Sequence, residues 1–366
     1  ACAGRVIADM MNYEFTDVDS DAIRAHFDSR PKSDPDRCIA TFALAKAAES
    51  AGDWDKTIAL YHQANAAYPQ TTFDSDQFDG AIAARIQAFD AASLQTQAAP
   101  KPDGPTPIFI LGLPRSGSTL LEQILASHSR IEGTIEQPVL PSISRKAHKI
   151  CALKYNGDVL EKIGALTSEE LSQLGRAYIS DGALFRAQGT PYFTDKLPFN
   201  FLHVGLIHKI LPHAVIIDAR RNPMDCGFSL YKQHFPTGVD FSYDLKNIAA
   251  YYNAYLRLMD HWDSVLPGRV FKIQYEELVR APERHVRALL DHIGLEFEES
   301  CLKFHLNDRA VRTASSEQVR QPINAKGIGV WRKVARDLAP LKDSLGDAAL
   351  AHMVHDRAIE DMDFAQ

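Results

Sequence analysis

The feature that most constrains the fold is a short apolar run that leads through a Gly/Ser-rich turn into a helix. Residues 107–111 (PIFIL) read as a strand, and the pattern TLLEQILASH after the turn is helical. Further strands are predicted at 192–195, 214–218 and 269–274, and helical patterns lie at 200–211, 224–234, 244–266 and 282–293. Continuous apolar strands that alternate with helices are typical of a parallel sheet covered on both faces. We therefore predict an α/β fold with three layers and a central parallel sheet.

The turn itself has the spacing of a phosphate-binding loop. Gly112 and Gly117 are separated by four residues, and Ser118 and Thr119 open the helix, which is the P-loop pattern with Ser118 in the place of the lysine. Such a turn points backbone N–H groups at an anion, and Arg115 can supply the charge of the missing lysine. Loss of the lysine weighs against ATP chemistry. The pattern favours a 5′-linked anion that needs no metal.

The first hundred residues have a different character. Residues 38–98 are rich in Ala and Gln, and a helix over 38–52, a break at Gly52 and a second helix over 54–67 are expected. Spacings within this pair resemble a tetratricopeptide repeat (TPR), with an ordinary helical hairpin as the alternative. Four prolines in 97–107 indicate a linker. We therefore predict a helical, TPR-like region over 1–104, which could contact other proteins, and an α/β domain over 105–366.

Composition excludes several classes of protein. Hydrophobic residues make up 45% and charged residues 24%, as in ordinary globular proteins, and the net charge of −7 argues against nucleic-acid binding through bulk charge. No apolar run approaches about 20 residues, so no membrane span is expected, and the N-terminus lacks a signal-peptide pattern. Five scattered cysteines without a C-x-x-C pair favour inert thiols in a reducing compartment. A cytoplasmic location is the resulting expectation. Two histidine pairs, His203 with His208 and His352 with His355, come without matching ligands, so no metal site is expected.

Three segments together resemble the sulfotransferases that use 3′-phosphoadenosine-5′-phosphosulfate (PAPS). PRSGSTLLEQIL is similar to the 5′-phosphosulfate loop of that family, and NAKGIGVWRK is similar to its late Gly-rich segment. In DARRNPMDCGFS, Arg221 is followed eight residues later by Ser229, as in the 3′-phosphate site of the family. Independently, an arginine at a strand end and a hydroxyl on the next helix suit a phosphate over the sheet edge. The resemblance covers roughly 107–340 and is greatest to the tyrosylprotein branch and its TPR-linked bacterial relatives.

The resemblance implies a set of nucleotide-binding residues. Trp331 would offer a stacking face to the adenine, with a packing role as its alternative. PAPS as co-substrate and adenosine 3′,5′-bisphosphate (PAP) as product would be bound by Arg115, Ser116, Gly117, Ser118, Thr119, Leu120, Arg221, Ser229, Tyr275, Asn324, Lys326, Gly327, Trp331 and Arg332.

The resemblance also implies catalytic residues. In-line transfer of a sulfuryl group to a hydroxyl needs a base on the acceptor and cations at the leaving phosphate oxygen. Glu136 in RIEGTIEQPVLPSI aligns with the catalytic glutamate of the tyrosylprotein branch, and Glu132 is the competing candidate. Lys196 in TDKLPFNF, Ser315 in TASSEQVRQPIN and Arg115 match residues on the leaving side. No metal is required in this chemistry.

Two other functions stay open. A P-loop kinase or ATPase would need a Mg²⁺ ligand, for which Asp218 is a candidate, although it leads directly into two arginines. Alternatively, the helical region would be an interaction module and the α/β domain an inactive scaffold. The acceptor is not determined by these patterns, and small molecules, glycans, lipids and peptides all fit. Departures from the tyrosylprotein pattern at Gln137, Gln233 and Val330 argue against a peptidyl tyrosine.

Overall fold

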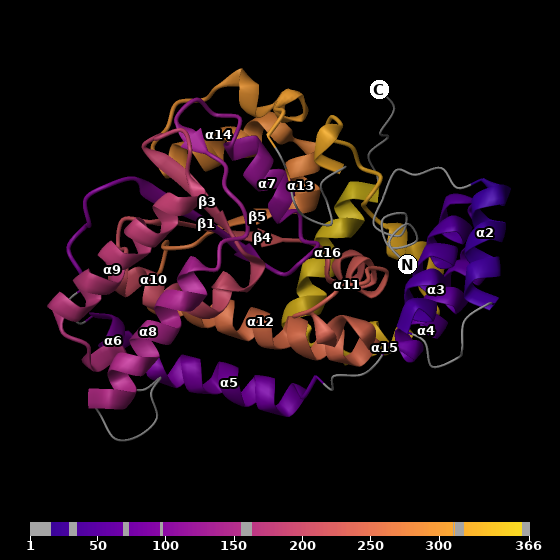
Figure 1. Ribbon diagram of the computed structural model, residues 1–366, viewed down its shortest axis with the longest axis horizontal. Helices are drawn as coiled ribbons and strands as arrows, with labels where there is room; N and C mark the ends of the chain where they lie inside the picture. Colours follow the sequence, from indigo (N-terminus) through magenta and orange to yellow (C-terminus); the bar gives the residue numbers. More distant parts are fainter. Residues whose placement is uncertain are drawn as a thin grey trace. The chain divides into compact units, whose positions relative to one another are not determined.

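The computed structural model describes residues 16–28, 35–68, 73–95, 98–154, 163–309, 311 and 318–360. Contacts divide the chain into two compact units, of which unit 1 comprises 1–75, 222–253 and 324–366, and unit 2 comprises 76–221 and 254–323. The helices (Figure 1) are α2 (Asp17–Asp28), α3 (Pro35–Ser50), α4 (Trp54–Ala67), α5 (Ser75–Ala88), α6 (Ala91–Gln95), α7 (Ser118–Leu125), α8 (Val139–Lys154), α9 (Ser168–Gly182), α10 (Val204–Ile210), α11 (Pro223–Tyr231), α12 (Leu245–Val265), α13 (Tyr275–Arg280), α14 (Pro282–Ile293), α15 (Ala339–Ser344) and α16 (Asp347–Glu360).

Unit 2 is built on a parallel sheet with the strand order β2-β3-β1-β4-β5. In the register, Gly112 pairs with Ala219 and Ile110 with Lys196, so neighbouring strands end at the same edge. The strands are β1 (Thr106–Gly112), β2 (Ile131–Glu132), β3 (Tyr192–Lys196), β4 (Val215–Arg220) and β5 (Phe271–Gln274). The predicted α/β fold with a central parallel sheet is confirmed. The two-residue strand β2 was not predicted, because two residues carry no periodicity.

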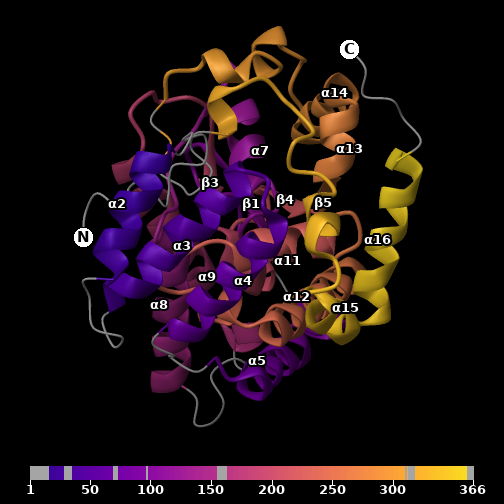
Figure 2. The same ribbon diagram turned by 90° about the vertical axis from the view of Figure 1, so that its right-hand side faces the viewer.

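Helices cover both faces of this sheet. On one face, α7, α13 and α14 pack against β1, β4 and β5 through a buried apolar cluster that includes Ile110, Ile124 and Leu289, as both ribbon views show (Figures 1 and 2). On the other face, Tyr178 of α9 lies 5.4 Å from the Phe109 ring of β1. Because both faces are buried, β1 and the first half of β4 are continuous apolar runs rather than alternating ones, which is the pattern that made them visible in the sequence.

Unit 1 contains the predicted helix pair. Gly52 adopts φ 75° between α3 and α4, and Asp53 caps α4 by accepting from the Lys56 N–H at 3.1 Å. The pair is joined to α11 and to the residue after it by polar contacts. Glu49 forms an ion pair with Lys232 at 2.6 Å, and the Asn65 amide donates to the Tyr231 carbonyl at 3.0 Å; these two contacts fix the pair against α11. The TPR-like character and the division at residue 105 stay predictions.

The described cysteines are buried free thiols at Cys38, Cys151, Cys226 and Cys301, as the inert-thiol interpretation expects, whereas Cys2 lies outside the described residues. Burial raises the pKa of the Cys38 thiol to about 12, which keeps it protonated. In the part of the chain that the structure describes, no helix is both long and apolar enough to cross a bilayer.

Candidate active site

The loop after β1 has the backbone conformation that its glycines predict. Gly112 and Gly117 adopt φ values of 136° and 95°, in the region that glycine occupies without strain. A Cβ on Gly112 would also collide with the Ala219 carbonyl oxygen of β4. Arg115, between the two glycines, has φ 70°, an unfavourable value for a side chain with a Cβ. Such strain at a sheet edge is characteristic of sites where a ligand completes the structure.

Three of the predicted nucleotide-binding segments meet at this loop. The Arg221 guanidinium, directly after β4, donates to the Arg115 carbonyl at 2.9 Å and lies 5.0 Å from the Tyr275 ring centroid. The Tyr275 ring packs on Gly117, where a Cβ would lie 2.7 Å from its Cδ2 atom. The structure therefore brings Arg115, Gly117, Arg221 and Tyr275 together, and their role in nucleotide binding stays a prediction.

The hydroxyl groups of the loop are buried. Ser116, Ser118 and Thr119 are 3%, 5% and 6% exposed, and Leu120 is partly buried beside them. The Ser116 Oγ atom has no hydrogen-bond partner among the described residues. Because a buried hydroxyl without a partner costs about 1–3 kcal/mol, an anion that accepts from Ser116 would satisfy the loop.

Lys196 and Glu136 form an ion pair at the same sheet edge. Lys196 ends β3 and its side chain is 1% exposed, whereas the Glu136 side chain is 43% exposed. The segment that carries Glu136 is attached to β3, because Thr134 donates its N–H to the Thr194 hydroxyl at 3.1 Å. The Gln137 amide donates to the Thr134 hydroxyl at 2.7 Å. A cation and an accessible carboxylate thus lie side by side.

Glu132, the competing base, has a different environment. Its side chain is 4% exposed, and its carboxylate accepts from the backbone N–H groups of Ala187 and, at 2.9 Å, Gln188. Arg186 lies 3.4 Å away as a third partner. Both N–H groups donate to the same oxygen, Oε1, and they tie the Glu132 carboxylate to the 186–188 turn.

Two further buried carboxylates lie in the strands. Asp218 accepts from the Tyr255 hydroxyl and from Arg220 Nε at 2.6 Å, so the carboxylate that could have served Mg²⁺ is held by protein donors. Asp195 accepts from the Tyr178 hydroxyl at 2.7 Å, and burial raises its pKa to about 7. Neither carboxylate is directed to solvent, and the described residues hold no cluster of three metal-ligating side chains.

The other predicted residues belong to unit 1 or are not described. Ser229 lies on α11 and is 9% exposed, and Asp225 of the same helix accepts from the N–H groups of Gly329 at 2.6 Å and Trp331 at 3.3 Å. The Trp331 indole N–H has no partner among the described residues. The segment that Asp225 holds also carries the predicted residues Asn324, Lys326, Gly327 and Arg332. Ser315 lies outside the described residues.

Sequence reasoning missed residues that organise the site. Glu122 of α7 is 2% exposed and forms an ion pair with Arg309 at 3.1 Å. Asp225 holds the Gly-rich segment by accepting from its backbone. A signal existed for both acids, since each is the one charged residue of its helix. Nothing in the sequence pattern paired Arg309 with Glu122, because the two are far apart along the chain.

More than half of the chain matches a known family. A family model described as the sulfotransferase family matches residues 107–299, just over half of the chain. The chain belongs to the sulfotransferase family. The match begins at β1 and includes the loop, Lys196, Arg221 and Tyr275.

Individual relatives of this sulfotransferase-family chain were also found. An uncharacterized protein of Aquifex aeolicus (strain VF5) is 31% identical over 345 residues, which cover 92% of this chain but 45% of that protein. A putative protein-tyrosine sulfotransferase of Caenorhabditis briggsae is 25% identical over 65% of this chain and 88% of its own length. Among solved structures, the sulfotransferase domain of the Synechococcus PCC 7002 olefin synthase matches with a TM-score of 0.47 and 24% identity, over 73% of this chain and all of that one. This chain thus spans less than half of its Aquifex relative.

Proposed function

We propose that the protein transfers the sulfuryl group of PAPS to a hydroxyl acceptor. The observation that carries this proposal is the conjunction, at one sheet edge, of a strained anion loop with a buried cation and an accessible carboxylate. Family membership supports the class of reaction, and the unpartnered Ser116 hydroxyl supports an anionic ligand in the loop.

Each group has a proposed role in the displacement. Glu136 accepts the proton of the acceptor hydroxyl while the acceptor oxygen forms its bond to sulfur. The bond between sulfur and the 5′-phosphate oxygen breaks at the same time, so the products are a sulfate ester, PAP and the proton on Glu136. Lys196 and Arg115 stabilise the negative charge that develops on the leaving oxygen. Ser315 is proposed for the leaving side on the sequence resemblance alone.

The nucleotide contacts are assigned by the same reasoning. Ser116, Gly117, Ser118, Thr119 and Leu120 would hold the 5′-phosphosulfate through backbone N–H groups and hydroxyls at the start of α7. Arg221 would bind the 3′-phosphate, with Tyr275 beside it. The unit 1 residues rest on the sequence resemblance: Ser229, Asn324, Lys326, Gly327, Trp331 and Arg332.

Features of the site disfavour phosphoryl transfer from ATP. Ser118 stands in the place of the P-loop lysine, and both oxygens of Asp218 accept hydrogen bonds from protein groups. A kinase needs a lysine on the phosphates and a carboxylate on Mg²⁺. The acceptor is proposed only as a hydroxyl compound, and contacts of the TPR-like helices with another protein are part of the same proposal.

A calorimetric titration tests the proposal. PAP should bind and raise the temperature of thermal unfolding, because a ligand that binds the folded state stabilises it. ATP with Mg²⁺ should produce neither effect. Binding of ATP·Mg²⁺ without binding of PAP would replace the sulfotransferase proposal with the kinase. A screen of hydroxyl acceptors with labelled PAPS then identifies the second substrate.

A further inference from the structure

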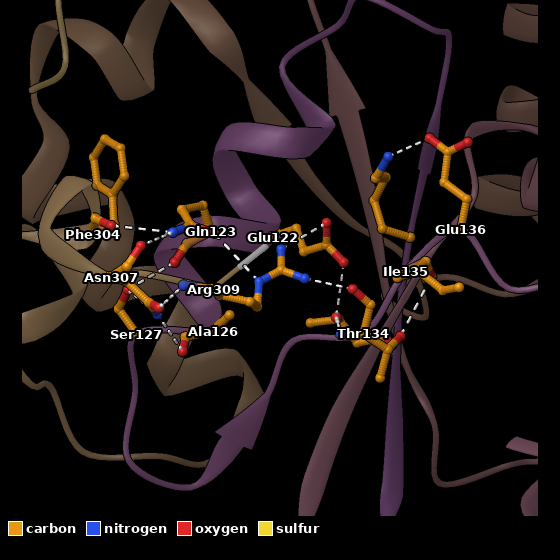
Figure 3. A network of polar contacts seen from close by, with 12 residues as sticks. Glu122, Gln123, Ala126, Ser127, Thr134, Ile135, Glu136, Phe304, Asn307 and Arg309 are labelled. Atoms are coloured by element: carbon orange, nitrogen blue, oxygen red, sulfur yellow. Dashed lines mark hydrogen bonds and ion pairs between the residues drawn. The ribbon is translucent and has the colours of Figure 1, made fainter. Parts of the chain in front are cut away.

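A buried arginine connects the anion loop helix to the segment that carries Glu136. The Arg309 guanidinium donates to the Thr134 carbonyl oxygen, lies 3.1 Å from the Glu122 carboxylate, and donates from Nε to Gln123 Oε1 at 3.4 Å. Figure 3 shows the Arg309 guanidinium with Gln123 of α7 on one side and Glu122 of α7 and Thr134 on the other. All of these groups belong to unit 2.

The contacts continue from Glu122 into β3. Its Oε1 atom accepts from the Thr194 hydroxyl at 3.1 Å, and that same hydroxyl accepts from the Thr134 N–H at 3.1 Å. Thr134 is therefore held through its N–H by β3 and through its carbonyl by Arg309. Since Thr134 precedes Glu136 by two residues, these bonds fix the backbone from which the Glu136 side chain extends.

Gly133 gives an independent indication that the position of the guanidinium matters. A Cβ on Gly133 would lie 2.7 Å from Arg309 Nε and 2.6 Å from the Ala126 Cβ. Its φ is not in the left-handed region, so the backbone conformation does not demand glycine. The missing side chain instead leaves the space that the guanidinium occupies.

The backbone of Arg309 is fixed as well. Arg320 donates to the carbonyl oxygens of Asn307 and Arg309, each at 2.6 Å. The Asn307 side chain in turn donates to the Ala126 carbonyl at 3.1 Å, at the end of α7. The side chain of Arg309 is 14% exposed and that of Glu122 is 2% exposed. A pair so nearly buried contributes little net stability, because desolvation offsets the attraction.

We propose that Arg309 is a positioning residue for Glu136. It fixes the 133–137 segment between α7 and β3, and thereby sets the direction from which the carboxylate meets the acceptor hydroxyl. This inference rests on the proposed function, in which Glu136 is the base. Catalysis depends on such placement, since displacement of a group by about 1 Å can cost about a hundredfold in rate.

The first test is the variant Arg309→Lys, which keeps the charge but loses the planar fork that reaches Thr134 and Glu122 together. PAPS consumption, with 4-nitrophenol or water alone as acceptor, should fall about ten- to a hundredfold in kcat. The affinity for PAP should stay within about twofold, because the variant does not touch the loop. Arg176→Ala, which breaks an exposed ion pair with Glu169 elsewhere in unit 2, is the matched control and should keep wild-type activity.

A double-mutant cycle separates positioning from a general loss of structure. If Arg309 acts through Glu136, the double variant Arg309→Lys/Glu136→Gln should be no slower than Glu136→Gln alone. If the fold losses in kcat of the two single variants multiply in the double variant, the proposal is overturned.

Gly133→Ala provides the second variant, in which every charged group is retained. It should reproduce the loss of kcat with unchanged PAP affinity, whereas Gly80→Ala, where a Cβ meets no atom within 4 Å, should not. Should Arg309→Lys fail to fold, full activity of a folded Gly133→Ala protein would overturn the proposal.

Failure of the proposed function can be told apart from failure of the positioning role of Arg309. A wild-type protein that neither binds PAP nor consumes PAPS removes both proposals. Wild-type turnover with an unimpaired Glu136→Gln variant removes the role of Glu136 and, with it, that of Arg309. An impaired Glu136→Gln protein beside a fully active Arg309→Lys protein removes the positioning role alone.

Discussion

Two glutamates four residues apart differ in what surrounds them, and this difference is the reason for proposing Glu136 rather than Glu132 as the base. Glu132 accepts from two backbone N–H groups and faces Arg186, whereas Glu136 has Lys196 as an ion-pair partner and a half-exposed carboxylate. A base must reach the acceptor hydroxyl, so accessibility is required as well as charge. The Glu132 carboxylate is bonded to a turn, whereas the Glu136 side chain is 43% exposed.

Replacement of these glutamates should therefore separate catalysis from stability. Glu136→Gln should retain PAP binding while transfer falls by about 10² to 10⁴, because the proton acceptor is lost. Glu132→Gln should instead lower the free energy of unfolding by about 1–3 kcal/mol, since its charge-assisted hydrogen bonds weaken. Radiolabel transfer and thermal unfolding measure the two effects. Normal transfer by the first variant and none by a stable second variant would reverse the assignment.

Arg221 supports a second prediction at the scale of the residue. Arg221→Ala removes a charge-assisted contact of roughly 1.5–3 kcal/mol, so the Kd for PAP should rise about ten- to a hundredfold. Calorimetry with PAP measures the change, and Arg176→Ala serves as the control for loss of one positive charge. An unchanged Kd would show that the guanidinium holds the Arg115 carbonyl and Tyr275 for structural reasons only.

At the scale of the element, α11 carries both Ser229 and the anchor of the Gly-rich segment. Two backbone donors of that segment, from Gly329 and Trp331, converge on the single carboxylate of Asp225. Asp225 is 2% exposed, so the segment is held by a buried charge rather than by a surface contact. The position of the predicted adenine-stacking ring thus depends on one side chain of a helix.

Asp225→Asn should loosen this segment without removing a predicted nucleotide ligand. The amide can accept one of the two hydrogen bonds at neutral strength, so PAP affinity should fall several-fold, by about 1 kcal/mol. Asp343→Asn, at an exposed position of α15, is the control in unit 1. Equal affinities of the two variants would contradict a link between the segment and the nucleotide.

The elements also show how far the sequence could predict the structure. The four predicted strands and the glycine conformations of the loop were readable, because apolar runs and glycine spacing are local properties. The pairs Glu122–Arg309 and Glu49–Lys232 were not, since each joins segments that are distant along the chain. The competing roles of Glu132 and Glu136 stayed open for the same reason: the donors to Glu132 come from residues 186–188. Local pattern predicts elements, whereas the partners of a buried charge depend on the fold.

At the scale of the whole molecule, buried titratable groups set the response to acid. Burial, with nearby cations, lowers the pKa of His203 to about 3 and those of His208 and His213 to about 4. These histidines take up protons near pH 6.5 only on unfolding, so each reduces stability as the pH falls below that value. Asp195, with a pKa raised to about 7, has the opposite effect, because its folded form binds the proton more tightly. Three histidines outweigh one aspartate, and the protein should lose stability between pH 6.5 and about 4.

Two variants should change this loss of stability at low pH in opposite directions. His203→Gln should make the decline shallower, by about 1.4 kcal/mol per pH unit for the one proton removed. Asp195→Asn should make it steeper, because the stabilising protonation is lost. Urea unfolding at a series of pH values between 4 and 7 measures both slopes. Parallel slopes for wild type and both variants would show that other groups control the acid response.

The left-handed backbone of Arg115 has a consequence for laboratory evolution of this protein. Glycine would adopt φ 70° without the cost that arginine bears there, about 1 kcal/mol or more. A selection that rewards heat resistance alone would therefore favour Arg115→Gly and discard the guanidinium that is proposed to stabilise the leaving phosphate. Libraries screened for thermostability should be screened for turnover in the same round, since the residue that favours stability at position 115 is expected to lower turnover.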